Sequence, residues 1–295
     1  MIMTCARTKN IKGIPLHYCV AAAQGRREYM EDTYCVSELH DKRMLFAIFD
    51  GHGGQCVAKY CAKNLTTFIN SMQSNQKQNT TSPAYVDRLF MSLDEDACYE
   101  CPSHCGATAL LLFADKHKLH FANCGDSMAM IIDKQGNTHM MSVEHKVENK
   151  DEKARIEAAG GVITYDDGTA RINRQLNVAR ALGDAHLKEY VISDPYQAQF
   201  PINNVRLVIM ASDGLWDVYT PSQLAADVKE YEAMQGLQSL QSLHSLQRQT
   251  NKQSLAQSQS QSNIDAGLSS WLITRAIHQR GSSDNITVIT IRPEI

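Results

Sequence analysis

Acidic residues stand where apolar stretches of the chain end. Four aspartates occupy such ends, or the turn between two apolar runs: Asp50, Asp126, Asp213 and Asp284. Glu31 and Asp32 add two acids in a charged loop. If these side chains converge, their repulsion would force some of them to take up a proton unless a cation neutralises them. The alternative is that the aspartates are separate turn residues.

An all-oxygen set of this kind favours a hard divalent cation. Carboxylates select magnesium, manganese or calcium over zinc, and few protein ligands per ion suit Mg²⁺ or Mn²⁺, which keep bound waters. One aspartate shared by two ions would hold them about 3.5–4 Å apart, and a water between them would become a nucleophile for in-line attack on phosphorus. The acids therefore predict a two-metal site for phosphoryl chemistry.

Residues near Asp50 could complete that chemistry. Gly51 lets a ligand approach the backbone closely, and His52 could protonate a departing oxygen. Arg27 could hold a phosphate through its planar guanidinium group. The alternative for Arg27 is a solvated ion pair with a neighbouring acid.

Strands must bring these acids together at one edge of a sheet. Apolar runs at 45–49 and 205–211 predict buried strands, and strict alternation at 286–291 predicts a third. Short strands joined by turns over 108–132 predict an antiparallel meander that carries Asp126.

Helices are predicted where apolar residues recur every three to four positions. The first two follow the Asp50 segment and cover 57–72 and 85–97. The others start at capping residues: Asn149, with Glu152 as the second half of a capping box, Thr220, with Pro221 at the first helical position, and Asp265.

Composition limits the classes of protein that fit. The chain has 295 residues, of which 43% are hydrophobic, and a net charge of −3. No basic stripe points to nucleic acid, and no apolar run approaches the length of a membrane span. The nine cysteines show no disulfide-scaffold spacing and no signal-like segment opens the sequence. We therefore expect a soluble protein with mostly free thiols, cytoplasmic and/or nuclear.

The chain is predicted to form one domain over residues 1–295. Within it we expect an N-terminal arm or edge strand at 1–15, a flap region at 145–203 and a Gln- and Ser-rich low-complexity insertion at 234–263. Leucines three apart in the insertion make a poor core face, because that spacing lags an α-helix by about 60° per step. We therefore expect the insertion to be disordered or weakly helical. The alternative is a helix that binds a partner.

Three cysteines and a histidine cluster at 98–105. Cys98, Cys101, His104 and Cys105 have a zinc-like spacing, but no second pair with finger spacing follows. The interpretation that we favour is a set of loosely placed free thiols, with a zinc site as the alternative.

Seven short blocks make the chain resemble the PP2C (PPM) family of metal-dependent protein serine/threonine phosphatases. They lie in the family's order, together span about residues 16–292, and occupy 27–32, 49–54, 105–109, 123–127, 179–184, 211–217 and 283–287. The second block reads Phe-Asp-Gly-His-Gly-Gly and the sixth Ala-Ser-Asp-Gly-Leu-Trp-Asp. Each block alone is a weak signal, whereas seven in order are specific.

The resemblance implies an α+β fold, a four-layer α/β/β/α sandwich in which two central antiparallel sheets are flanked by helices. It also implies two Mg²⁺ or Mn²⁺ ions per chain, with a weaker third, in a cleft at one edge of the sheets. By matching position, the residues that would ligate metal or hold metal-bound water are Asp50, Gly51 through its carbonyl, Asp213, Asp284, Glu31, Asp32 and, for the third ion, Asp126.

The remaining roles implied by the resemblance concern substrate and support. His52 would be the general acid, Arg27 would bind the substrate phosphate, and Thr108 and Asn285 would be supporting residues. Water bridging the two ions would attack the phosphorus of a phosphoserine or phosphothreonine.

The sequence departs from the family pattern near the flap. Arg174 stands where the family often has Gly, and Ala179 where it often has Ser, so the departures concern substrate contacts and leave the metal set complete. The leading hypothesis is an active, monomeric phosphatase with phosphoprotein substrates and no nucleic-acid or membrane partner. The alternatives are a catalytically weak pseudophosphatase acting as a binding scaffold, and a metal nuclease, which the missing basic stripe disfavours.

Overall fold

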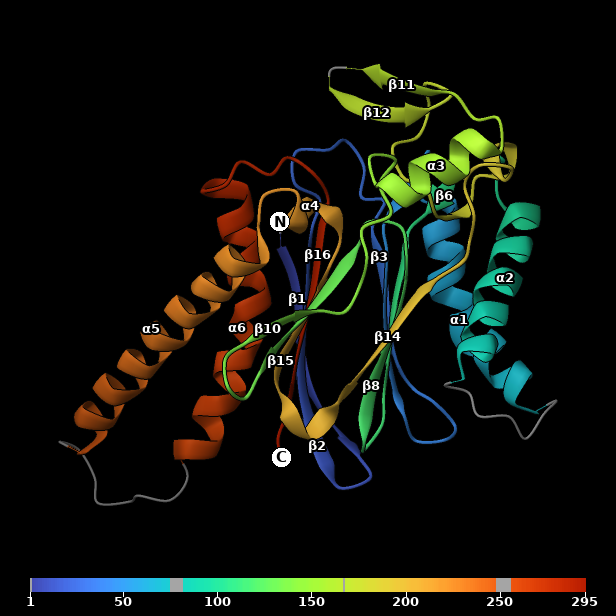
Figure 1. The fold of residues 1–295 in the computed structure, drawn as a ribbon. Helices are drawn as coiled ribbons and strands as arrows, with labels where there is room; N and C mark the ends of the chain where they lie inside the picture. The colour runs from blue at the N-terminus through green and yellow to red at the C-terminus, as the bar shows by residue number, and fades with distance from the viewer. Residues whose placement is uncertain (1, 75–81, 167, 248–255) are drawn as a thin grey trace.

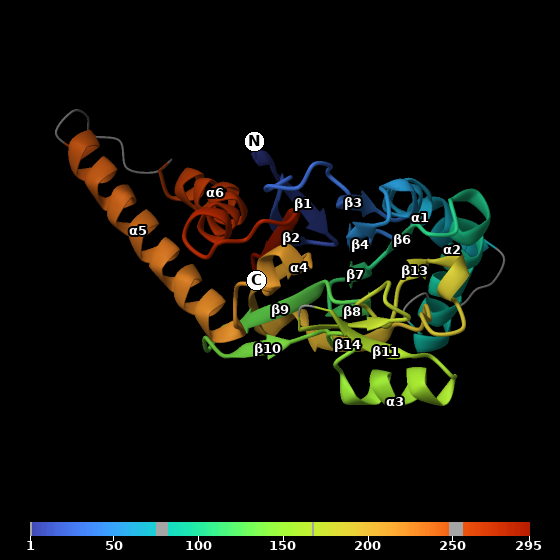
Figure 2. The same cartoon turned by 90° about the horizontal axis from the view of Figure 1, so that it is seen from above.

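The structure, a computed structural model, describes residues 2–74, 82–166, 168–247 and 256–295, with side chains described outside 73–74 and 238–266. Two antiparallel sheets lie face to face at the centre, and helices cover the outer face of each (Figures 1 and 2). These layers confirm the predicted α+β class and the α/β/β/α sandwich. No helix in the described ranges is long and apolar enough to cross a membrane.

The larger sheet has six strands in the order β1-β2-β16-β15-β9-β10. Their bounds are Ile2–Ile11 (β1), Ile14–Ala23 (β2), Ile286–Pro293 (β16), Val205–Ala211 (β15), Met128–Asp133 (β9) and Thr138–Met140 (β10). Strand β1 pairs along its whole length with β2, which confirms an edge strand within residues 1–15.

The smaller sheet has five strands in the order β14-β8-β7-β4-β3. Their bounds are Tyr196–Pro201 (β14), Lys118–Cys124 (β8), Ala109–Ala114 (β7), Met44–Phe49 (β4) and Thr33–Glu38 (β3). Strand β14 lies inside the segment that we assigned to the flap, so that prediction was too broad. Residues 196–201 pair with β8 as an ordinary edge strand.

Alternation along the strands explains why β4 is apolar throughout. Phe46 and Ile48 point into the core between the two sheets, whereas Leu45, Ala47 and Phe49 point outward against α1 and α2. Both faces of the strand are covered, so every position is buried and apolar. The apolar run that the sequence shows at 45–49 is the result.

Two groups of helices cover the sheets. Helices α1 (Cys56–Ser74) and α2 (Pro83–Glu100) pack on the five-stranded sheet. Helices α4 (Asp213–Trp216), α5 (Pro221–Gln247) and α6 (Ala256–His278) pack on the six-stranded sheet, and the far part of α5 projects from the body (Figure 1). Thr220 and Gln223 exchange hydrogen bonds at the start of α5, which confirms the predicted helix start.

The predicted start of the last helix was wrong, and the insertion takes the helical form of the two that we left open. Helix α6 begins at Ala256, so Asp265 lies within it and does not cap it. The low-complexity segment 234–263 is helical on both sides of residues 248–255, which lie outside the described residues. The insertion is thus an extension of α5 and α6, because Gln, Ser and Leu all tolerate helical backbone.

The flap lies over one end of the sheets (Figure 1). It contains helix α3 (Lys150–Ala158), the hairpin β11 (Ile163–Asp166) and β12 (Thr169–Ile172), and the 3₁₀ turn η1 (Ala185–Leu187). Asn149 caps α3 as predicted, but Glu152 does not complete a capping box. Its buried carboxylate instead binds Arg155 and Arg180, where two charge-assisted bonds outweigh one backbone N–H.

A three-stranded ribbon connects the flap to the sheets. It consists of β13 (Leu182–Gly183), β6 (Gly106–Ala107) and β5 (Gly51–His52), with β6 in the middle. His52 pairs with Gly106, and Gly106 pairs with Gly183. The ribbon brings the segment that follows β4 beside the flap.

Candidate active site

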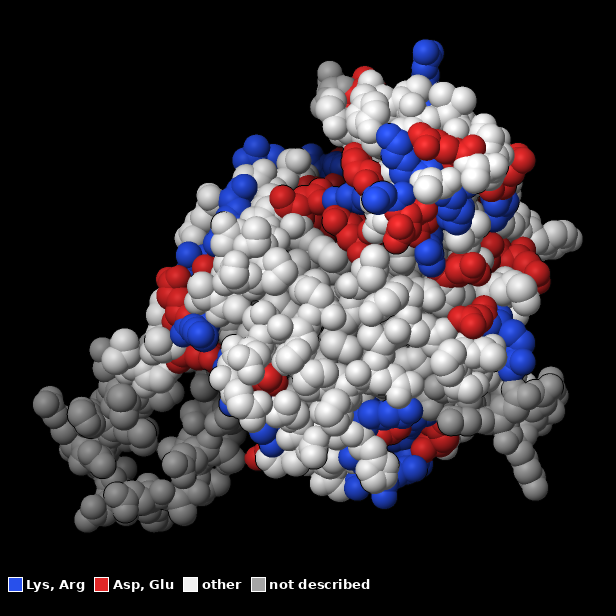
Figure 3. Space-filling view, viewed as in Figure 1, with Lys and Arg blue, Asp and Glu red and all other residues white. Residues whose placement is uncertain are grey.

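A cavity of about 690 Å³ lies at the end of the sheets that carries the flap. Most residues predicted for the site line it: Arg27, Glu31, Asp50, Gly51, His52, Thr108, Asp126, Asp213, Asp284 and Asn285. Asp32 is buried and is not part of the lining. Acidic and basic side chains gather at this end of the molecule, while the face below is mainly uncharged (Figure 3).

Asp50 is placed by the end of β4 and by Thr108. The N–H of Thr108 donates to the carbonyl oxygen of Asp50 at 2.8 Å, and Thr108 Oγ1 lies 2.8 Å from Ser127 Oγ. A Cβ on Gly51 would stand 2.7 Å from the backbone oxygen of Glu31. A larger residue would therefore clash with the Glu31 backbone at this position. This requirement for glycine adds to the backbone access for a ligand that we expected.

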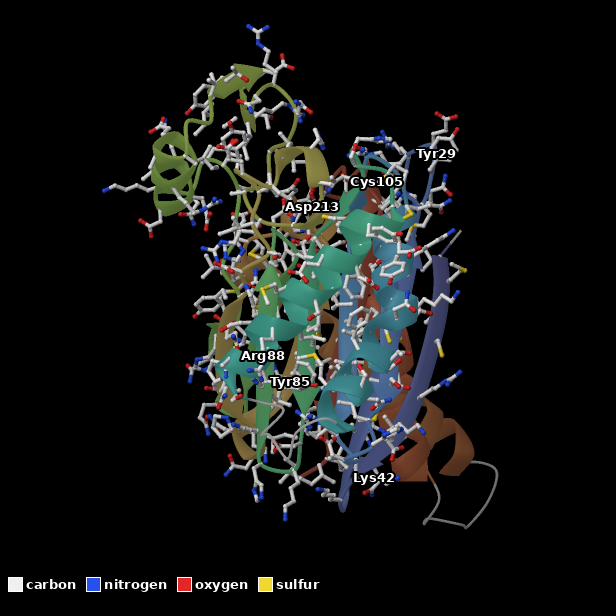
Figure 4. All side chains as sticks on the ribbon, turned by 90° about the vertical axis from the view of Figure 1, so that its right-hand side faces the viewer. Tyr29, Lys42, Tyr85, Arg88, Cys105 and Asp213 are labelled. Atoms are coloured by element: carbon white, nitrogen blue, oxygen red, sulfur yellow. A yellow bond between two sulfur atoms is a disulfide. The ribbon has the colours of Figure 1, made fainter. Side chains whose placement is uncertain are left out.

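Asp213 reaches the cavity from the other sheet. It starts α4 directly after β15, with Ser212 as the residue between them. The Ser212 hydroxyl donates to Asp32 Oδ2 at 2.8 Å and accepts the N–H of Thr287 at 3.0 Å. The serine thus ties Asp32 to the junction of β15 and α4. Figure 4 shows Asp213, Cys105 and Tyr29 at the flap end and Lys42 at the opposite end.

The acids lie close enough to disturb one another's ionisation. Burial, then the charges of Asp213, Asp32 and Asp126, raises the pKa of Asp50 well above its usual range. Burial, then Asp213, does the same for the pKa of Asp126. Burial, then Asp217 and Asp284, raises the pKa of Asp213 to about 6, and burial raises that of Asp32 to about 7. The predicted convergence is therefore real for these residues.

The donor set fits a hard divalent cation. Its side-chain ligands are all carboxylates, and Oδ1 of Asp32 is buried without a hydrogen-bond partner in the described structure. A cation would neutralise the repulsion, and a water bound to it would supply the missing partner of Asp32. In the described ranges, however, no three His, Cys, Asp or Glu side chains stand in a ready metal-binding arrangement.

Asp284 is bonded to Arg27. Arg27 Nη2 lies 2.5 Å from Asp284 Oδ2, at the partly exposed rim of the cavity. The Asp284 carboxylate also accepts the N–H of Asn285 at 2.7 Å. Two residues to which we assigned different tasks, phosphate binding and metal ligation, are thus joined as an ion pair.

Asn285 holds the loop that carries Glu31. Its side-chain oxygen accepts the N–H of Glu31 at 2.7 Å, and its side-chain nitrogen donates to the carbonyls of Gln24 and Tyr29. All three bonds run from Asn285, just before β16, to a segment more than 250 residues away in sequence. These bonds tie the Glu31 loop to Asn285, and the supporting role that the resemblance implies for Asn285 stays a prediction.

Lys146 forms ion pairs with two acids beside the cavity and acts on the charge of Asp126. Lys146 Nζ lies 2.7 Å from Asp217 Oδ1 and 2.9 Å from Glu144 Oε1. Its charge also lowers the pKa of Asp126 against the larger effect of burial. Sequence reasoning missed Lys146 and Asp217, and no local pattern marks a lysine that meets an acid 71 residues away.

Several cavity residues from the flap region were also missed. Asp184 Oδ2 lies 2.7 Å from Nε2 of His52. Arg171 and His186 line the cavity and both bond to Gln175. Two sequence signals could have singled out Asp184: it ends the family-like block at 179–184, and the Gly-Asp pair at 183–184 resembles the Gly-Asp turn at 125–126.

The cysteine cluster differs from both of our alternatives. Cys101 forms a disulfide with Cys56, with 5.9 Å between their Cα atoms, so Cys101 is neither a free thiol nor a zinc ligand. The seven other cysteines are free. The Cys105 thiol donates to the carbonyl of Gly53 at 2.9 Å and so packs behind the Asp50 segment. Folding brings Cys56 to Cys101 because α1 and α2 lie side by side.

Comparison with protein families and curated proteins gives consistent matches. The family model described as Protein phosphatase 2C matches residues 16–266. "Probable protein phosphatase 2C 11" of Arabidopsis thaliana is 31% identical over 291 residues, which cover 97% of this chain and 68% of the relative. "Probable protein phosphatase 2C 59" of Oryza sativa is 32% identical and covers 93% and 75%. Another Arabidopsis relative, "Probable protein phosphatase 2C 71", is 33% identical, and the chain spans 55% of it.

Solved structures share the fold. A Caenorhabditis elegans sex-determining protein superposes with a TM-score of 0.76 at 25% identity, covering 94% of this chain and 64% of that one. A serine-threonine phosphatase 2C from Toxoplasma gondii superposes with a TM-score of 0.75 at 19% identity, covering 100% and 99%. The second likeness concerns the fold alone.

Proposed function

Because the chain belongs to the protein phosphatase 2C family, we propose that it hydrolyses phosphoserine and phosphothreonine in phosphoprotein substrates at the cavity described above. The observation that carries this proposal is the convergence of Asp50, Asp126 and Asp213, from three separate elements, beside Arg27 and His52. Repelling carboxylates next to a guanidinium group and an imidazole suit a site that handles phosphate and cations.

Mg²⁺ or Mn²⁺ would be the cofactor, two ions per chain with a weaker third. Asp50, Asp213 and Asp284 would hold one ion, Asp50 and the Gly51 carbonyl the second, and Asp126 with Asp213 the third; Glu31 and Asp32 would hold bound waters. When bound, the ions would neutralise the carboxylates and supply the water that attacks phosphorus.

Arg27 would bind the phosphate and set its orientation. Its side chain is 59% exposed at the rim, and its guanidinium group already binds one carboxylate, Asp284, so its N–H groups point toward the cavity edge. A phosphate would exchange with Asp284 as the acceptor, since both present paired oxygens to the planar fork.

His52 would deliver a proton to the departing serine or threonine oxygen. Its side chain lines the cavity and is 24% exposed, so a substrate can reach it. An alkoxide is a poor leaving group, and a positioned acid typically accelerates its departure about 10²–10⁴-fold.

The proposal is tested with the purified chain, a phosphoserine peptide and Mn²⁺. We expect phosphate release that is lost in EDTA and lost in Asp50→Ala and Asp213→Ala. Asp133→Asn is a matched control, because Asp133 is also a buried acid but bonds His139 and is absent from the cavity lining. Equal phosphate release with and without EDTA would contradict the proposal.

The pseudophosphatase alternative gains no support from the site, because each acid matched to the family is present. Monomeric action in the cytoplasm and/or nucleus stays a prediction. Sedimentation of the purified chain and fluorescence imaging of a tagged copy would test it.

A further inference from the structure

Asp184 is a buried acid in the cavity wall to which the proposed reaction assigns no task. Its carboxylate is 2% exposed and lies 2.7 Å from Nε2 of His52, although 132 residues separate the two in sequence. Among the hydrogen bonds between described residues, none uses Nδ1 of His52, so Asp184 alone orients the ring through a side chain.

The backbone around Asp184 is held from several sides. Asp184 has left-handed backbone angles, φ 50° and ψ 44°. Its N–H donates to the carbonyl of Cys105 at 2.8 Å and its carbonyl accepts the N–H of Leu187 at 2.7 Å. The preceding Gly183 donates its N–H to Asp94 Oδ1 at 2.8 Å. Such a conformation persists only where its surroundings enforce it.

Gly106 leaves the space in which the two side chains meet. It lies on the middle strand of the ribbon, between His52 and Gly183. A Cβ at this position would stand 2.0 Å from Asp184 Oδ2 and 2.3 Å from His52 Nε2. The imidazole and the carboxylate therefore occupy the volume that any larger residue on β6 would fill.

We propose that Asp184 is a positioning residue for His52, an inference that rests on the proposed phosphatase function. Asp184 accepts the Nε2–H of the ring, which fixes the ring plane and leaves Nδ1–H to face the leaving oxygen. As the water oxygen bonds to phosphorus, the bond from phosphorus to the serine oxygen breaks and that oxygen takes the Nδ1 proton. One proton of the water passes to solvent and the other stays on the phosphate product. Nε2–H stays bonded to Asp184, and His52 regains a proton from solvent.

The first test is Asp184→Asn. Asn keeps the size of the side chain and tolerates left-handed backbone angles, so the fold should survive. We expect kcat on a phosphoserine peptide to fall about 10–100-fold, with less than about 3-fold change for an activated aryl phosphate, which needs no acid. KM should stay within about 3-fold, because Asp184 does not touch the phosphate.

Two further variants separate positioning from structure. The added methyl group of Gly106→Ala would separate His52 from Asp184 without replacing either residue. This variant should therefore also lower kcat on the phosphoserine peptide more than on the aryl phosphate. In a His52→Gln background, Asp184→Asn should lower kcat no further, since residues acting as a unit are non-additive. Asp133→Asn is the matched control, because its Oδ2 lies 2.9 Å from His139 Nε2 outside the cavity. It should leave both substrates unaffected.

A readout without turnover distinguishes this inference from the proposed function. In ¹⁵N-labelled protein without metal, long-range ¹H–¹⁵N correlation should show Nε2–H on neutral His52, and Asp184→Asn should shift that resonance or mix the tautomers. Absence of phosphate release by the wild type would refute the proposed function and leave this spectrum as the test. Equal losses on both substrates, additive losses with His52→Gln, or an unchanged His52 spectrum would each overturn the positioning role.

Discussion

At the scale of single residues, the ionisation of the acids in and beside the cavity depends on how deeply folding buries them. Asp126 and Asp32 are buried, and Asp50 and Asp213 are partly so, and all four resist ionisation. Arg27 and Asp284 at the rim form a partly exposed ion pair instead. Without a cation the buried acids repel one another, so the residues proposed to bind metal would destabilise the metal-free fold.

Asp213→Asn should stabilise the protein in EDTA. The pKa of Asp213 is raised in the folded state to about 6, from 3.8 unfolded, so its contribution to stability is present below pH 4 and is lost as the pH rises through 6. Removing the charge should add about 1–3 kcal/mol to the free energy of unfolding at pH 8 and nothing at pH 3. Urea unfolding at both pH values measures this.

Asp133→Asn gives the opposite expectation and serves as the control. Hydrogen bonds, first from His139, lower the pKa of Asp133 to about 2, so its loss should destabilise the protein at pH 8. An Asp213→Asn variant that is also less stable in EDTA at pH 8 would contradict the repulsion argument.

His145 should make stability fall in mild acid. Burial lowers its pKa from 6.5 to about 4, and its ring bonds the backbone of Gly125. The unfolded chain takes up this proton first, so stability is full above pH 6.5 and falls as the pH drops toward 4, by about 2–3 kcal/mol. His145→Gln should show a correspondingly weaker loss between pH 7 and 5; an identical pH dependence would refute the prediction.

At the level of elements, a short ribbon, a disulfide and the hydrogen bonds of Asn285 join the segments that form the cavity walls. The ribbon β13-β6-β5 aligns His52 with Asp184, and the disulfide ties the start of α1, just after the Asp50 segment, to the end of α2. Asn285, just before β16, likewise joins two distant segments through its bond to the Glu31 backbone. Each connection joins segments distant in sequence, so together they fix the cavity walls relative to one another.

Reducing the Cys56–Cys101 disulfide should destabilise the fold. The bond closes a loop with a sequence separation of 45 residues, for which chain entropy predicts about 4 kcal/mol and measured cases usually give about 2–4. Cys56→Ser should lower the free energy of unfolding by that amount and abolish any effect of dithiothreitol. Cys5→Ser, at a free cysteine, should keep the wild-type response to reductant. Insensitivity of the wild type to reductant would contradict this prediction.

In the molecule as a whole, two sandwiched sheets form a rigid base for a cavity built from loops. The core between the sheets is apolar, while charged groups gather at the flap end (Figure 3). Helix α5 packs through Leu224, Val228 and Tyr231, and beyond them Leu237 is 61% exposed. Among the described side chains of α5, Leu237 therefore contributes little to the core.

Replacing residues 235–262 by a short linker should leave fold and phosphatase activity nearly intact. The last described anchors on the two sides are Tyr231 and Leu268, both buried and both retained. We expect a melting temperature within about 4 °C of the wild type, which corresponds to about 1 kcal/mol or less. Tyr231→Ala, which removes an anchor, should instead cost about 3 kcal/mol. A collapse of the linker variant would show that the segment supports the core.

Local patterns along the chain predicted the strands of the sheets and most residues of the cavity, whereas the four layers were implied by the resemblance to the PP2C family. Periodicity reports burial, so the strands at 45–49, 205–211 and 286–291 and the meander were predictable, and acids at their ends pointed to the cavity. The helical extension beyond residue 234 was not, because weak apolar spacing cannot distinguish a solvated helix from disorder.

Only the tertiary structure decided which side chains meet. The pairs His52–Asp184, Cys56–Cys101 and Arg27–Asp284 join residues 132, 45 and 257 positions apart. The residue type shows that an aspartate can accept a proton or bind a cation. Its place at the end of a predicted strand shows that it lies near an edge of the sheet. Which partner it finds depends on how loops and flap close over that edge, and this is set by packing of the whole chain, which no local spacing encodes.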